Sequence, residues 1–149
     1  RRPARPLRAR GAEAMKGETF LDTAYLLALL NPRDTWHAKA VALSGLPLGR
    51  LVTTNAVLTE VADALSSPSH RGWAADAIGD LLGDPNVACL AIDAQLFNGS
   101  LELYRGRRDK AWSLTDCMSF VVMKKRRLTD ALTSDVHFAQ AGFRALMRE

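Results

Sequence analysis

Short apolar runs alternate with longer segments of helical periodicity along the chain. Runs rich in apolar or β-branched residues that are too short for helices predict buried strands at 19–21, 51–54, 87–92 and 130–133. Apolar positions at helical spacing predict helices at 24–30, 34–43, 55–65, 71–82, 93–105, 114–126 and 137–141, with a last edge strand at 143–147. This alternation predicts an α/β fold with a parallel sheet covered by helices on both faces.

Composition is that of one ordinary globular domain. The chain has 149 residues, of which 48% are hydrophobic and 24% are charged. No apolar run approaches the roughly 18–20 residues that a membrane-spanning helix needs. Cys89 and Cys117 each have apolar neighbours, so we expect both to be reduced, buried thiols of a cytosolic protein.

The net charge of +4 comes from the first residues. Residues 1–14 hold five arginines and one acid, Glu13, whereas residues 15–149 hold 15 basic and 15 acidic residues. We interpret 1–14 as a disordered extension or upstream sequence before a domain that begins at Met15; a nucleic-acid-binding arm is the alternative. Within the neutral domain, two local basic runs, 105–110 and 124–127, are candidates for attracting a polyanion, although solvated helix ends would look the same.

Four acids occupy positions at which an open parallel sheet binds ligands. Asp22 and Asp135 directly follow predicted strands, Asp116 lies in the first turn of an apolar helix, and Glu60 lies at the margin of an apolar helical face. Singly, each is also explained as a helix cap, a turn residue or an exposed side chain. Together in one crevice they would repel one another unless a divalent cation neutralised them. Mg²⁺ and Mn²⁺ prefer such oxygen ligands, so the set indicates a site for phosphate esters rather than for zinc.

Motifs for other chemistries are missing from the sequence. It contains no GxGxxG, GxxxxGK[ST], GxSxG, HExxH or CxxC, and its histidines, His37, His70 and His137, are scattered. Phosphoacceptor receiver domains and haloacid-dehalogenase-like phosphatases need a second acid near the first strand, which Asp22-Thr23-Ala24 does not provide.

The four acids lie in four short segments of the chain: Phe20–Tyr25, Thr53–Val61, Trp112–Cys117 and Ala131–Phe138. These segments resemble the acidic signatures of PIN domains, and more closely those of VapC-type toxins of bacterial toxin–antitoxin pairs. The resemblance covers about residues 18–147 and implies a three-layer α/β/α domain with a mainly parallel sheet of four to five strands. It also implies Mg²⁺- or Mn²⁺-dependent endonucleolytic cleavage of RNA.

The resemblance assigns roles residue by residue. Asp22, Glu60, Asp116 and Asp135 take the family's acidic positions. Asp22 and Asp116 would hold the metal, Asp135 would bind it directly or through water, and Glu60 would orient the attacking water. Thr133 would support these acids with its hydroxyl, and Asp130 would be a further acid near the rim.

The resemblance also implies partners: an RNA substrate, a cognate antitoxin whose C-terminal segment lies across the groove, and a second copy in a homodimer. Four aromatic residues are candidates for stacking on RNA bases, although their spacing is also that of core residues: Trp36, Trp73, Trp112 and Tyr104. A non-catalytic RNA- or partner-binding module with the same fold is the competing interpretation.

Overall fold

The structure is a computed structural model that describes residues 17–149, so the interpretation of residues 1–14 lies outside the described residues. In the described residues, five parallel strands form one sheet in the order β3-β2-β1-β4-β5. Their bounds are β1 Glu18–Leu21, β2 Arg50–Thr54, β3 Val87–Leu90, β4 Asp130–Leu132 and β5 Arg144–Ala145. The expectation of a mainly parallel sheet of four to five strands is therefore confirmed.

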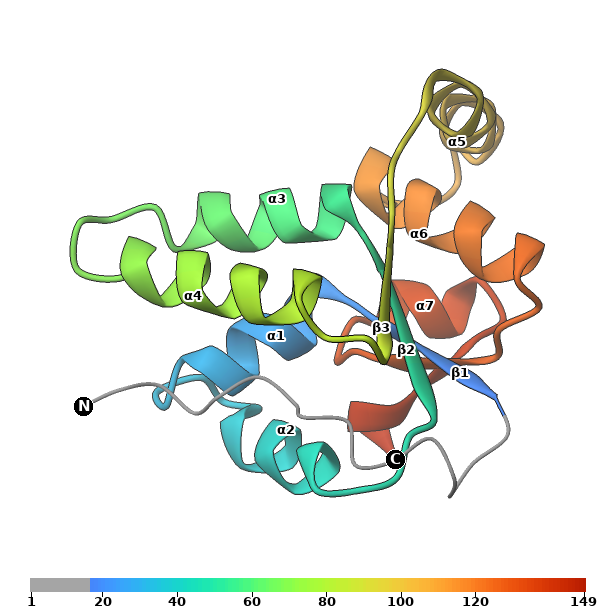
Figure 1. Ribbon diagram of the computed structural model, residues 1–149. Coiled ribbons are helices and arrows are strands. Elements are labelled where there is room, and N and C mark those ends of the chain that lie inside the picture. The colour runs from blue at the N-terminus through green and yellow to red at the C-terminus, as the bar shows by residue number, and fades with distance from the viewer. Residues whose placement is uncertain (1–16) are drawn as a thin grey trace.

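Within residues 17–149, seven α-helices complete the α/β/α sandwich. They are α1 Thr23–Leu30, α2 His37–Ser44, α3 Asn55–Ala64, α4 Arg71–Leu82, α5 Ala94–Gly106, α6 Leu114–Lys125 and α7 Val136–Gln140. Figure 1 shows α1–α4 on one side of the sheet and α5–α7 on the other. This is the arrangement that right-handed crossovers produce when the chain leaves the central strand first in one direction and later in the other.

Side-chain caps explain where several helices begin. The Thr54 hydroxyl accepts a hydrogen bond from the Val57 amide at the start of α3, and Asp93 accepts one from the Leu96 amide in α5. At α6, Ser113 and Asp116 form a capping box, in which each side chain accepts from the other residue's backbone amide. Each of these caps stands immediately before or inside the first turn that the sequence predicts.

Three predicted elements have wrong boundaries. The second helix begins at His37 rather than at residue 34, because the Asp34 carboxylate accepts from the Trp36 amide and forms a turn. The third strand ends at Leu90, and the last strand has only two residues before a 3₁₀-helix, Leu146–Arg148. Cys117 is buried as predicted, but Cys89 is only half-buried because it lies on edge strand β3.

An aromatic cluster under the carboxyl end of the sheet joins α6 to α7 and β1. The Phe120 ring meets Phe138 edge-on at 5.0 Å between centroids and Trp112 at 5.0 Å, and Phe138 also lies 6.2 Å from Phe20. Phe120 follows Asp116 by about one turn of α6, and Phe138 follows His137 directly. Packing of these rings therefore sets the distance between the polar groups that α6 and α7 present.

No helix within residues 17–149 combines the length and the apolar character that crossing a bilayer would require.

Candidate active site

A pocket of about 370 Å³ lies at the carboxyl end of the central strands. Four carboxylates line it: Asp22 after β1, Glu60 from α3, Asp116 from α6 and Asp135 after β4. These are the four acids that the sequence singles out, and segments up to 113 residues apart bring them together. The placement follows from the parallel sheet, whose strands all end at the same edge.

Asp22 is the most buried of the four, with only 5% of its surface exposed. It occupies the N-cap position of α1, yet its side chain makes no cap hydrogen bond. Instead its Oδ2 accepts a hydrogen bond of 2.7 Å from the Thr133 hydroxyl. Burial raises the pKa of Asp22 to about 7, and the neighbouring charges of Asp116 and Asp135 act in the same direction.

Glu60 points toward α1 from the third helix. Its Oε1 accepts a hydrogen bond of 2.7 Å from the Thr23 hydroxyl, which fixes one oxygen of the carboxylate. Partial burial raises the pKa of Glu60 above its ordinary value, opposed by the Thr23 hydrogen bond and reinforced by the charges of Asp116 and Asp135. The prediction that Glu60 lies at the margin of the apolar face is confirmed by its half-buried position.

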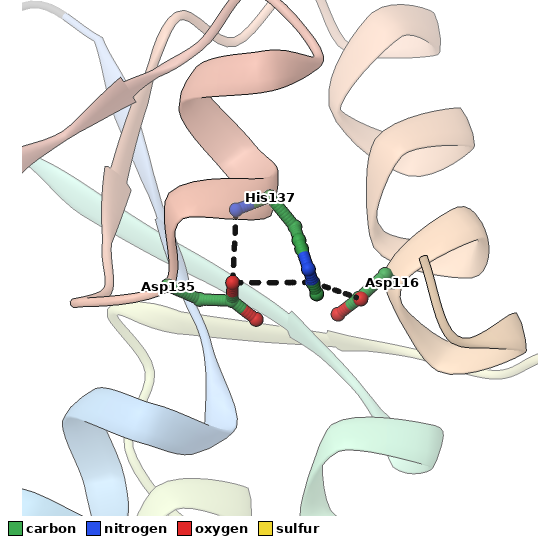
Figure 2. Close-up of side chains that lie close together, drawn as sticks. All are labelled: Asp116, Asp135 and His137. Atoms are coloured by element: carbon green, nitrogen blue, oxygen red, sulfur yellow. Dashed lines mark hydrogen bonds and ion pairs between the residues drawn. The ribbon is translucent and has the colours of Figure 1, made fainter. Parts of the chain in front are cut away.

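Asp116 and Asp135 face each other across the ring of His137 (Figure 2). The His137 Nδ1 lies 3.1 Å from Oδ2 of Asp116 and 3.2 Å from Oδ1 of Asp135. The second carboxylate also accepts a hydrogen bond of 2.8 Å from the His137 backbone amide, because Asp135 caps α7. With carboxylate oxygens on both sides, Nδ1 carries a hydrogen and donates it.

His137 is the residue at this site that sequence reasoning missed. The histidines look scattered along the chain, but two features mark this one. It follows Asp135 by two residues, and the capped turn of α7 folds its ring back over that acid. The direction of the ring depends on the packing of the next residue, Phe138, into the aromatic cluster. No periodicity in the sequence reports that direction.

The donor set fits a divalent cation. Asp116 and Asp135 each offer a carboxylate oxygen, and these two atoms lie within 4.8 Å of each other beside the ring of His137. The described residues that line the pocket include no lysine or arginine, so no fixed cation balances the four acids. The raised pKa values of Asp22, Glu60 and Asp116 have burial as their largest cause, and uncompensated acidic neighbours add to it. A hard cation bound among these oxygens would remove both the repulsion and the desolvation penalty.

Thr133 and Asp130, the two other residues that the sequence singles out, lie at opposite ends of β4. The Thr133 hydroxyl contacts two of the acidic residues, since it donates to the Asp22 carboxylate and accepts from the Asp135 backbone amide at 3.0 Å. Asp130, expected near the rim, lies instead at the beginning of β4, where it pairs with Arg144 at 3.3 Å. A strand separates it from the pocket, so that expectation is wrong.

Comparisons with known proteins agree with this geometry. A family model described as "PIN domain" matches residues 19–144. Two curated relatives from Mycobacterium tuberculosis strains, each called "23S rRNA-specific endonuclease VapC20", are 30% identical over 125 residues, which is 83% of this chain and 94% of theirs. The crystal structure of M. tuberculosis VapC20, described as a sarcin–ricin loop cleaving toxin, superposes with a TM-score of 0.80 at 28% identity, covering 87% of this chain and 98% of that one.

Proposed function

Because the chain belongs to the PIN-domain family, with VapC-type endonucleases among its relatives, we propose that it is the endoribonuclease toxin of a toxin–antitoxin pair. It hydrolyses RNA phosphodiester bonds at the pocket formed by Asp22, Glu60, Asp116 and Asp135. The observation that supports this most directly is the convergence of four carboxylates with no lysine or arginine among the described residues lining the pocket. A structural role would not need such an uncompensated cluster.

The proposed cofactor is Mg²⁺ or Mn²⁺, held by Asp22, Asp116 and Asp135. Such an ion supplies Lewis acidity, which neutralises charge on the phosphate oxygens and makes water a better nucleophile. Asp116 and Asp135 are already fixed by hydrogen bonds that do not use their second oxygens. His137 holds these two acids in register, and Thr133 does the same for Asp22.

Glu60 is the proposed general base. Its Oε1 is occupied by the Thr23 hydroxyl, so Oε2 is the oxygen left to orient the attacking water and accept its proton. Its raised pKa, caused mainly by partial burial, makes it a better proton acceptor than an ordinary glutamate. The role needs only that Glu60 reach into the pocket, which its place in the lining provides.

Cleavage of RNA tests the proposal. Purified protein is incubated with total RNA in Mg²⁺, in Mn²⁺ and in EDTA, and cut sites are mapped by primer extension, beginning with 23S rRNA because relatives are named for it. We expect discrete, metal-dependent cuts that fall by at least about 100-fold in Asp22→Asn and Asp116→Asn. Asp130→Asn is the matched control, since it removes an acid at the other end of the sheet.

The alternative is a non-catalytic module that binds RNA or a protein partner through the same pocket. It predicts RNA binding that depends on salt but no cleavage with either metal by folded protein free of antitoxin. Cuts that persist in both aspartate variants would likewise contradict the carboxylate mechanism.

An antitoxin is the proposed protein partner, as for the VapC-type relatives, and a homodimer is the proposed assembly. Light scattering during gel filtration measures the mass of the isolated chain, which is 16.3 kDa as a monomer. A mass that stays at the monomer value at all concentrations would contradict the dimer and leave the nuclease proposal untouched.

A further inference from the structure

A second pocket, of about 770 Å³, adjoins the carboxylate pocket where α5 ends and α6 begins. The two pockets share Ala111 and Ser113 in their linings, and Ser113 is the residue that caps the helix of Asp116. Residues on the connector between the helices supply most of the second lining, so we call it the connector pocket. The two pockets are therefore continuous, so that a ligand long enough to span both would occupy both.

The connector pocket is basic, in contrast to its neighbour. Arg107, Arg108 and Lys110 line it. Arg107 forms a bidentate pair with Asp109, and Lys110 lies 3.9 Å from the same carboxylate. Arg108 forms no ion pair within the described part of the chain, and none of the three cations pairs there with the acids next door. A net positive charge is thus held beside the acids without being used to neutralise them.

One aromatic side chain at this pocket is free to stack. The Tyr104 ring, at the end of α5, is 50% exposed. Trp112 is only 6% exposed, its indole N–H donates to Gln140, and the Arg107 guanidinium lies 4.8 Å from its ring centroid. Trp112 is therefore a structural wall of the pocket, whereas Tyr104 presents an open face.

The other aromatic and basic candidates lie elsewhere. Trp36 is covered by Arg148, and Trp73 packs against His70. The run 124–127 begins in the last turn of α6, about 12 Å along the helix from Asp116, and its Arg126 forms a bidentate pair with Glu18 at the beginning of β1. Of the two basic runs, only 105–110 adjoins the acids.

We propose that the connector pocket binds the RNA nucleotide next to the scissile phosphate. Arg108 and Lys110 bind its phosphate, and Tyr104 stacks on its base, which must be unpaired to reach the ring. The inference rests on the proposed function and extends it, because it selects single-stranded or loop RNA and assigns one flank of the substrate to one side of the acids.

Equilibrium binding in EDTA tests this site without any chemistry. A short, fluorescently labelled single-stranded RNA of mixed sequence is titrated with protein at several salt concentrations, and anisotropy gives Kd and its salt dependence. For Arg108→Ala/Lys110→Ala we expect at least about tenfold weaker binding and a salt slope smaller by about 0.7, which corresponds to one phosphate that is no longer neutralised. For Tyr104→Ala we expect about tenfold weaker binding with an unchanged slope, and Tyr104→Phe should restore it.

The matched control is Lys124→Ala/Lys125→Ala, which removes two exposed charges at the far end of α6. Equal losses in the two double variants would overturn the assignment, since the charge would then act non-specifically. Absence of binding by the parent protein, or unchanged binding in all the variants, would overturn it too. Because EDTA removes the metal, weakened binding without any metal-dependent cleavage would support the pocket while contradicting the nuclease.

Discussion

The two ends of the central sheet treat their acids in opposite ways. At the beginnings of the strands, Glu18 on β1 pairs with Arg126 and Asp130 on β4 pairs with Arg144. After the ends of the same two strands, Asp22 and Asp135 have no arginine or lysine partner within the described residues. Acids that link one secondary-structure element to another are therefore paired with arginines. Acids at the proposed site for a metal ion and a phosphate have no such partner.

Substitution of Asp22, the buried acid at the carboxyl end of the sheet, has the largest predicted effect on stability. In metal-free protein we expect Asp22→Asn to raise the free energy of unfolding at pH 8 by on the order of 3 kcal/mol, because burial penalises the ionised carboxylate. Since the folded pKa of about 7 lies above the ordinary 3.8, the contribution of Asp22 to stability is fully present below pH 4 and is lost as pH rises through 7.

Urea unfolding in EDTA at pH 4, 6 and 8 measures this dependence. Asp22→Asn should flatten most of the fall, whereas Asp130→Asn at the other end should retain it. Parallel pH curves for the parent and Asp22→Asn would show that Asp22 is not the group responsible.

His137 should affect metal binding more than stability. Removing its contacts to Asp116 and Asp135 in His137→Ala is expected to weaken Mn²⁺ binding about tenfold, since groups that orient ligands typically contribute that much. Isothermal titration calorimetry measures the affinity directly. His70→Ala is the control, because that imidazole contacts Ser67 far from the pocket; equal affinities in the two variants would contradict the orienting role.

Substitution of a paired acid at the beginnings of the strands should have the smallest effect. Glu18→Gln is expected to lower the free energy of unfolding by about 1 kcal/mol, since the Glu18–Arg126 pair is bidentate but partly exposed. Mn²⁺ affinity should not change, and a double-mutant cycle with Arg126→Gln isolates the pair's contribution. A coupled loss of Mn²⁺ affinity would mean that the two ends are not independent.

The sequence predicts positions on the sheet better than directions of side chains. Asp22 and Asp135 could be predicted at the pocket because a residue that follows a parallel strand lies at the ligand-binding edge. The supporting hydroxyl of Thr133 is expected from the family resemblance alone, and its hydrogen bond to Asp22 agrees with that expectation. The ring of His137 could not be placed in either way, since its direction depends on the packing of the adjacent Phe138 against Phe120, which is distant in sequence. The early end of β3 and the shortness of β5 have the same origin, because edge strands depend on neighbours as much as on propensity.

The two oxygens of Asp116 perform separate tasks. Oδ2 accepts from the Ser113 amide at 3.0 Å and from His137 at 3.1 Å, so both of its lone pairs are occupied by the protein, while Oδ1 is left for a ligand. An asparagine at this position would satisfy the two donors with its carbonyl oxygen and turn its NH₂ group toward the ligand. Asp116→Asn thus keeps the capping box of α6 and presents hydrogens to a cation, whereas Asp116→Ala would remove one of the two capping-box hydrogen bonds and the ligand together.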